Sequence, residues 1–99
     1  MVEPFSRAAG AVGERLRNIR TALGLSQEEV AYLADIHPTN YGKIERGRAN
    51  PSLTTVIRIA TALDTDAGEL ISGLTLADLP GRHRQYTAKD FIRERERMR

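Results

Sequence analysis

The chain of 99 residues contains no cysteine and no tryptophan, and its only two histidines, His37 and His83, lie 46 positions apart. Without thiols, disulfide bonds, thiolate zinc sites and cysteine nucleophiles are excluded. Two distant imidazoles do not have the spacing of a histidine-rich metal centre. We therefore expect no metal site and no cofactor, and a fold that rests on the packing of side chains.

Long apolar runs are also lacking. No uninterrupted apolar segment approaches the ~18–20 residues that cross a bilayer, and the first ten residues carry Glu3, Pro4 and Arg7 in place of an apolar signal core. Hydrophobic residues make up 40% of the chain and charged residues 28%, which is typical of globular proteins. We expect one domain core, no membrane association and a cytoplasmic location.

The net charge of the chain is only +2, but the charged residues are unevenly distributed along it. Residues 51–79 hold one arginine against four acidic residues, whereas residues 80–99 hold seven basic residues against three acidic ones. Pro80-Gly81 marks the change. The predicted organisation is an N-terminal arm (1–12), a domain (13–79) and a basic C-terminal tail (80–99).

Between Glu14 and Leu79 the apolar residues recur at intervals of three and four, a spacing that predicts an all-α domain of five helices. We expect the first helix from about Gly13 to Leu23, with Leu23 on its apolar face and Gly24 as its left-handed end. The segments 19–24 and 59–64 resemble each other, which we interpret as chance and shared helical composition.

The second helix has the clearest start, with Ser26 as N-cap and Glu29 as its capping-box partner. It ends near Asp35, a residue type that tolerates left-handed geometry. A third helix is predicted to begin at Pro38, with His37 as its cap. Its end is expected at Gly47.

Ser52 is the expected cap of the fourth helix, whose apolar stripe comprises Leu53, Val56, Ile57, Ala60 and Leu63. Asp66 and Glu69 are expected to cap a fifth helix that carries Leu70, Ile71 and Leu74. Thr87 and Asp90 have capping-box spacing in the tail, where Phe91, Ile92 and Met98 form a thin apolar stripe. The tail is therefore either a further helix or disordered in the free protein.

The segment from Gln27 to Arg46 places apolar or small residues where two helices crossing at a steep angle need them: Val30, Ala31, Ala34, Ile36, Tyr41 and Ile44. Through Leu25-Ser-Gln-Glu-Glu-Val-Ala, Ile36-His-Pro-Thr, Lys43-Ile-Glu-Arg-Gly and Asn50-Pro-Ser-Leu the sequence resembles the Cro/C1-type (XRE) helix-turn-helix family. The resemblance implies a compact lambda-repressor-like DNA-binding domain. Asp35 stands where the family usually has glycine.

The resemblance also implies sequence-specific binding of double-stranded DNA by a transcriptional regulator, a repressor by our interpretation, whose third helix lies in the major groove. Because Tyr41 and Ile44 turn to the core, the expected base contacts are Pro38, Thr39, Asn40 and Lys43. The expected phosphate contacts are Arg17, Arg20, Gln27, Arg46 and Arg48. Glu45 is expected to pair with a basic residue, either Arg46 or one on the first helix.

We expect a homodimer on a two-fold related operator, because one module of this size makes few base contacts. The expected interface comprises Leu70, Leu74, Leu76 and Leu79. The alternative is an antitoxin-like or other protein-interaction module whose Arg-rich tail binds a protein partner. Two further alternatives are that the tail contacts its dimer mate through the apolar stripe, or that it holds DNA nonspecifically. No catalytic constellation is present, so we do not expect an enzyme.

Overall fold

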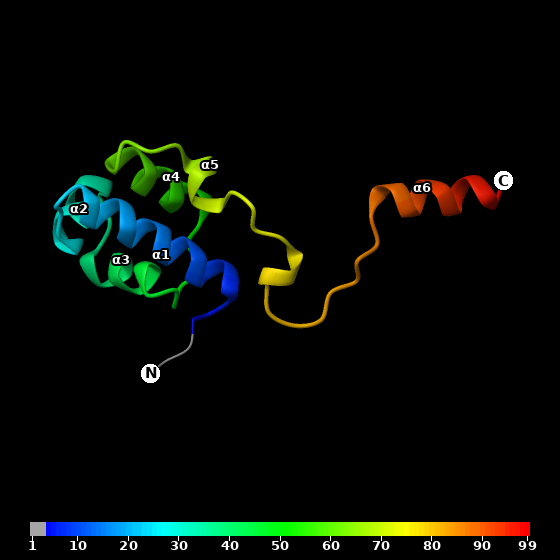
Figure 1. Ribbon diagram of the computed structural model, residues 1–99, viewed down its shortest axis with the longest axis horizontal. Helices are drawn as coiled ribbons and strands as arrows, with labels where there is room; N and C mark the ends of the chain where they lie inside the picture. Colours follow the sequence, from blue (N-terminus) through cyan, green and yellow to red (C-terminus); the bar gives the residue numbers. More distant parts are fainter. Residues whose placement is uncertain (1–3) are drawn as a thin grey trace.

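The computed structural model describes residues 4–99, which form six α-helices, one short 3₁₀ helix and no strand (Figure 1). The helices are α1 (Arg7–Ala22), α2 (Gln27–Ala34), α3 (Pro38–Glu45), α4 (Leu53–Ala62), α5 (Ala67–Ile71) and α6 (Ala88–Arg97), and the 3₁₀ helix is η1 (Leu76–Asp78). The prediction of an all-α fold is confirmed.

Helix α1 begins at Arg7, six residues before the expected start at Gly13, so half of the predicted N-terminal arm is helical. Ser6 is the N-cap, and its hydroxyl accepts a hydrogen bond from the amide of Ala9 at 2.9 Å. Ahead of the cap, the amide of Phe5 donates to the carbonyl of Gly47 at 2.6 Å. Residues 1–3 of the arm lie outside the described residues. Gly10 and Gly13 have low helix propensity, so the sequence around them does not indicate a helix.

The starts of α2, α3 and α4 follow the predicted caps. Ser26 and Glu29 form a complete capping box, and the amide of Thr39 donates to Nδ1 of His37 at 3.1 Å. The Ser52 hydroxyl accepts from the amide of Thr55 at 3.1 Å. Asp66 differs from the expectation, since it occupies the cap position of α5 without a side-chain hydrogen bond to the backbone.

Helices α1 and α4, which end in the similar segments 19–24 and 59–64, have the same C-terminal cap. Gly24 and Asp64 have left-handed backbone angles, with φ of 73° and 53°. The next residue in each case, Leu25 or Thr65, donates its amide to the carbonyl five positions earlier. This is the hydrogen-bond pattern of a Schellman cap. Helices α2 and α3 end with the same pattern, through Asp35-Ile36 and Gly47-Arg48, in segments of different sequence. The shared cap therefore does not account for the similarity, and our interpretation of it as chance and shared helical composition stays a prediction.

The core lies where α1 to α5 meet, and its largest fully buried side chains are Tyr41, Leu16, Ile59, Leu70 and Val30. The expected faces of α1 and α4 are partly wrong. Leu23, Leu53 and Ile57 are 53%, 73% and 48% exposed. Ile59 is buried instead, because α4 packs on α2 and α5 through the side of the helix that carries Ile59, Ala60 and Leu63.

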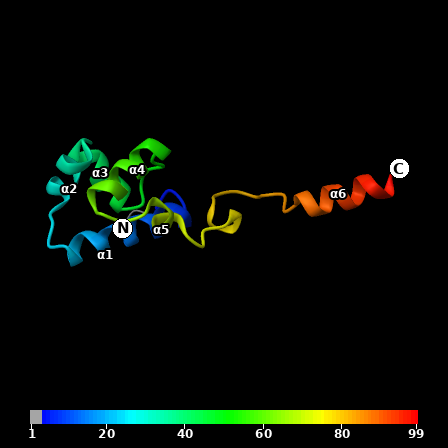
Figure 2. The ribbon, with the colours of Figure 1, turned by 90° about the horizontal axis from the view of Figure 1, so that it is seen from above.

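The tail forms a helix that stands apart from the body formed by α1 to α5 (Figures 1 and 2). Thr87 and Asp90 make the predicted capping box of α6, and none of its residues is buried. Of the two predicted states of the tail, the structure has the helical one. Among the described residues, no helix combines the length and apolar character that a membrane span requires.

Candidate nucleic-acid interface

Helix α3 has one face in the core and one face in solvent. Tyr41, Ile44 and Glu45 are buried. The four residues expected to contact bases, Pro38, Thr39, Asn40 and Lys43, are all exposed. They lie on the first two turns of the helix, so their polar groups and the Thr39 methyl face outward together.

Two shallow hollows flank the outward side of α3. One is lined by residues of α2 and α3: Gln27, Glu28, Pro38, Thr39, Gly42 and Arg46. The other is lined by α3 and the segment that leads into α4: Ile36, Asn40, Lys43, Ile44, Ala49, Pro51 and Thr55. The exposed side of α3 is thus a ridge between two hollows, a shape that complements the groove of a duplex.

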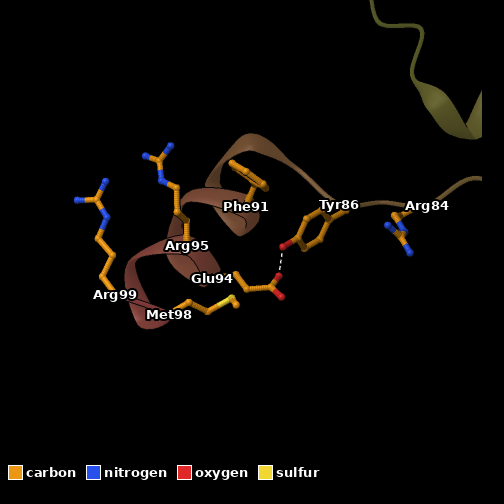
Figure 3. Close-up of a pocket in the computed structure, with 7 residues that line it drawn as sticks. All are labelled: Arg84, Tyr86, Phe91, Glu94, Arg95, Met98 and Arg99. Carbon is orange, nitrogen blue, oxygen red and sulfur yellow. Dashed lines mark hydrogen bonds between the residues drawn. The ribbon is translucent and has the colours of Figure 1, made fainter.

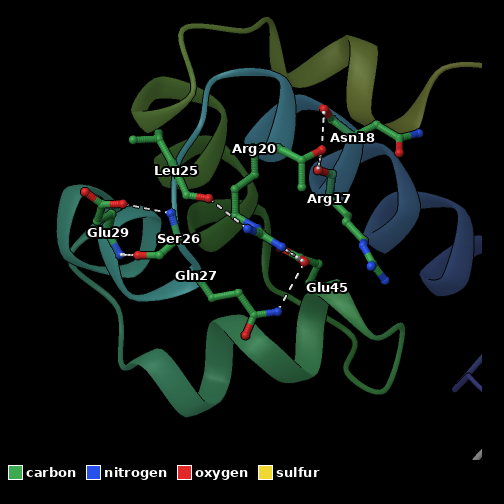
Figure 4. Close-up of polar contacts among 9 residues, drawn as sticks. Arg17, Asn18, Arg20, Leu25, Ser26, Gln27, Glu29 and Glu45 are labelled. Atoms are coloured by element: carbon green, nitrogen blue, oxygen red, sulfur yellow. Dashed lines mark hydrogen bonds and ion pairs between the residues drawn. The ribbon is translucent and has the colours of Figure 1, made fainter.

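A buried ion pair fixes the inner side of α3 (Figure 4). Arg20 of α1 donates from Nε and Nη2 to the two carboxylate oxygens of Glu45, at 2.8 and 2.7 Å. The side chains are only 13% and 3% exposed. This fork-on-fork geometry specifies direction as well as distance. Of the two kinds of partner expected for Glu45, the structure has the one on the first helix, Arg20.

The same cluster reaches the start of α2. Gln27 donates its side-chain amide to Glu45 at 3.1 Å, and Arg20 donates its third guanidinium nitrogen to the Leu25 carbonyl at 2.8 Å. Burial works to raise the pKa of Glu45, but the hydrogen bonds from Arg20 and Gln27 and the charge of Arg20 outweigh it and hold the pKa below its usual value. Glu45 is therefore ionised and joins α1, α2 and α3 at one point.

Tyr41 lies beside this cluster and is fully buried. Burial raises the pKa of its phenol, and the neighbouring Glu45 carboxylate raises it further. Within residues 4–99 its hydroxyl has no hydrogen-bond partner. Tyr41 is thus a neutral core residue that packs the inner side of α3.

The residues expected to contact phosphates divide into two groups. Arg17, Arg46 and Arg48 are exposed cations. Arg20 does not belong with them, because its guanidinium is committed to Glu45 and Leu25. Gln27 is half-buried and has one amide hydrogen bond to Glu45, which leaves the other amide hydrogen free for a ligand at the start of α2.

The residues expected at a dimer interface differ in their exposure to solvent. Leu70 is 1% exposed and belongs to the core of its own chain, so it is not available to a partner. Leu74 is half-buried against that core. Leu76 and Leu79 are 39% and 46% exposed. The sequence pattern marked all four as apolar but did not distinguish inward from outward positions.

Sequence analysis missed the contact of α1 with the end of α3. A methyl group on Gly13 would lie 2.3 Å from the Glu45 carbonyl oxygen, so only glycine permits this approach. A second missed contact joins α1 to α5, where Arg15 donates to the Leu70 carbonyl at 3.0 Å. Ser6 could have indicated this contact, because serine is a favoured N-cap residue. A helix that begins after Ser6 includes Gly10 and Gly13.

A family model described as helix-turn-helix matches residues 16–70, a range that contains α2, α3 and the whole ion-pair cluster. The prophage-derived uncharacterized HTH-type transcriptional regulator YonR of Bacillus subtilis is 31% identical over 86 residues, which cover 87% of this chain and 72% of YonR. Control protein C.BamHI of Bacillus amyloliquefaciens is 34% identical over 67% of this chain and 83% of its own length.

Among solved structures, the restriction-modification controller protein C.AhdI from Aeromonas hydrophila superposes with a TM-score of 0.61. It is 45% identical, and the match covers 63% of this chain and 94% of C.AhdI. More than a third of this chain lies outside that match.

Proposed function

The chain belongs to the Cro/C1-type helix-turn-helix family and is a DNA-binding transcriptional regulator, and we propose that it represses transcription as a homodimer with α3 in the major groove. The observation that carries this proposal is the division of α3 into two sides. The inner side is held by the Arg20–Glu45 ion pair, and the outer side presents four exposed residues at the surface.

The outer residues have chemistry that suits base edges. Lys43 donates to guanine O6 or N7, and Asn40 pairs with the N6 and N7 atoms of adenine. The methyl group of Thr39 meets that of thymine, and Pro38 packs at the start of the helix. Each good contact of this kind is worth ~1–3 kcal/mol of discrimination between bases.

The phosphate contacts in this proposal are Gln27, Arg17, Arg46 and Arg48. Gln27 lies in the first turn of α2, where backbone amides and the helix dipole attract an anion. Arg46 and Arg48 follow the end of α3, and Arg17 projects from α1. Arg20 is omitted, since a bound phosphate would have to compete with Glu45 for its guanidinium.

Two copies related by a two-fold axis would bind half-sites ~34–36 Å apart. Leu74, Leu76 and Leu79 remain the proposed dimer contacts. In this proposal the DNA-binding domain ends near Leu79, residues 80–99 form a separate basic tail, and the protein acts in the cytoplasm, where operator DNA is found.

Selection of bound sites from random duplexes, repeated at two salt concentrations, tests the proposal. We expect a two-fold symmetric motif. Lys43→Ala should relax the preference at one position of each half-site by ~1–3 kcal/mol. Lys89→Ala is the matched control, because it removes an exposed lysine from α6, outside the α3 surface.

Full retention of the operator preference by the Lys43→Ala variant would count against α3 as the recognition helix. Arg48→Ala should weaken binding to all sequences alike and reduce the salt slope by about one. A change in base preference with that variant would mean that Arg48 contacts a base.

A further inference from the structure

The outward side of α2 carries an apolar and acidic surface that DNA binding does not use. Leu25, Glu28, Glu29, Tyr32 and Leu33 line one hollow there, which we call the α2 surface. Tyr32 is 84% exposed and Leu33 is 55% exposed. Side chains of this size and exposure, gathered in one place, are typical of a protein contact.

The charged residues of the segment that carries the α2 surface have one sign. From Leu23 to His37 the chain contains Glu28, Glu29 and Asp35 but no lysine or arginine. Glu29 is held by its capping box, where the Ser26 amide donates to its carboxylate at 2.8 Å. An apolar partner with cationic side chains would therefore match this surface.

Helix α6 has that composition. One hollow on α6 and its flanking residues is lined by the aromatic and apolar side chains of Tyr86, Phe91 and Met98, by Arg84, Arg95 and Arg99, and by Glu94 (Figure 3). The three arginines outnumber the single carboxylate, which accepts a hydrogen bond from the Tyr86 hydroxyl. Phe91 and Met98 are 53% and 82% exposed. The Arg95 guanidinium lies over the Phe91 ring, 5.8 Å from its centroid, so cation and apolar surface face the same way.

Helix α6 also lacks the packing that normally stabilises a short helix. It has ten residues, and every residue from Ala88 to Arg97 is exposed except Asp90, which is half-buried in the cap. Isolated helices shorter than ~12–15 residues are marginal in water. An apolar helix face of this length gains stability when another surface covers it.

We propose that α6 of one copy docks on the α2 surface of a second copy. Phe91 and Met98 would then pack on Tyr32 and Leu33, while Arg95 and Arg99 meet the carboxylates of Glu28 and Glu29. The lengths agree, since eight residues of α2 span ~12 Å and ten residues of α6 span ~15 Å.

The position of α6 favours a second copy over the same chain. The two helices lie at opposite ends of a molecule that is 59 Å long (Figures 1 and 2). Reciprocal exchange of α6 between two copies satisfies both surfaces and closes around a two-fold axis. This contact goes beyond the proposed function, because it requires no DNA and leaves the outer side of α3 free.

Cross-linking tests the contact directly, because the chain has no cysteine of its own. Leu33→Cys and Ile92→Cys variants are purified separately, mixed and oxidised without DNA. We expect a covalent dimer to form about tenfold faster than in a mixture of Arg58→Cys and Ile92→Cys, since docking raises the local thiol concentration to ~mM. Arg58 is an exposed residue of α4 outside the α2 surface.

Three outcomes would overturn the proposal. Equally fast linking of the Ile92→Cys variant alone would mean that two tails pair with each other. Linking within one chain of the doubly substituted variant, with no dimer, would place α6 on its own α2. No linking above the control would assign α6 to a different partner. DNA binding is measured separately on the same samples, so a failure of this contact is distinguishable from a failure of the proposed function.

Charge exchange provides a second test by sedimentation without DNA. Glu28→Arg and Arg95→Glu should each weaken self-association about tenfold, because an attraction becomes a repulsion. The chain that carries both substitutions should regain the original association. Equal or additive weakening in the double variant would contradict a direct pairing of these two side chains.

Discussion

Helices α3 and α6 are of similar length and begin with a side-chain cap, yet only α3 has a fixed orientation. His37 caps α3 and Thr87 caps α6. Glu45 of α3 is tied to Arg20, 25 residues earlier, whereas α6 has no buried residue. A cap is sufficient to start a helix, but only distant contacts orient it. Recognition of base edges requires an oriented helix, and α3 has this property.

The largest expected effect is the loss of the anchor of α3. Glu45→Gln leaves the largely buried Arg20 guanidinium without a counter-ion and should lower the free energy of unfolding by about 3 kcal/mol. Glu94→Gln changes the same residue type on α6 and should leave the unfolding of the body unaltered. Urea denaturation measures both. Equal stability of the two variants would remove the energetic distinction between the helices.

The anchor also has a pH signature. Because the pKa of Glu45 is lowered in the folded state, its stabilising contribution is complete above the ordinary glutamate pKa of about 4.3. That contribution is lost as pH falls through the lower folded pKa. The stability difference between the wild type and Glu45→Gln should therefore shrink in acid. A difference that grows as pH falls would contradict this assignment.

The next largest effect concerns the close approach of α1 to α3. Gly13→Ala should destabilise the protein by ~1–3 kcal/mol, because its methyl group would collide with the Glu45 carbonyl. Gly10→Ala, in the same helix, meets Pro4 at an ordinary 3.4 Å and should be neutral or stabilise by up to ~1 kcal/mol through helix propensity. Thermal unfolding separates the two. A Gly13→Ala variant as stable as the wild type would show that the helices shift apart at little cost.

The smallest effects compare caps in the two regions. Ser26→Ala should lower the global stability by about 1 kcal/mol, because α2 is part of the cooperative body. Thr87→Ala should reduce helical circular dichroism slightly without moving the unfolding midpoint. If the Thr87→Ala substitution shifts that midpoint as far as Ser26→Ala, α6 unfolds together with the body.

Sequence analysis predicted the outward residues of α3 well and the neighbouring cations less well. Lys43 and Asn40 were placed correctly because Tyr41 and Ile44 define the buried side of a regular helix. Arg20 was misplaced, since an arginine on an amphipathic helix looks like a surface cation until its buried partner is known. The base and phosphate contacts themselves remain predictions.

The amino-acid sequence determined where helices begin and end, as Ser26, Asp35 and Thr87 illustrate. Those signals act through hydrogen bonds between residues three to five positions apart, so they do not depend on the rest of the fold. Tertiary structure alone decided that Arg20 meets Glu45, that Gly13 must lack a side chain, and that Leu70 is buried. These outcomes depend on which helix faces meet, and the packing of the whole body determines that.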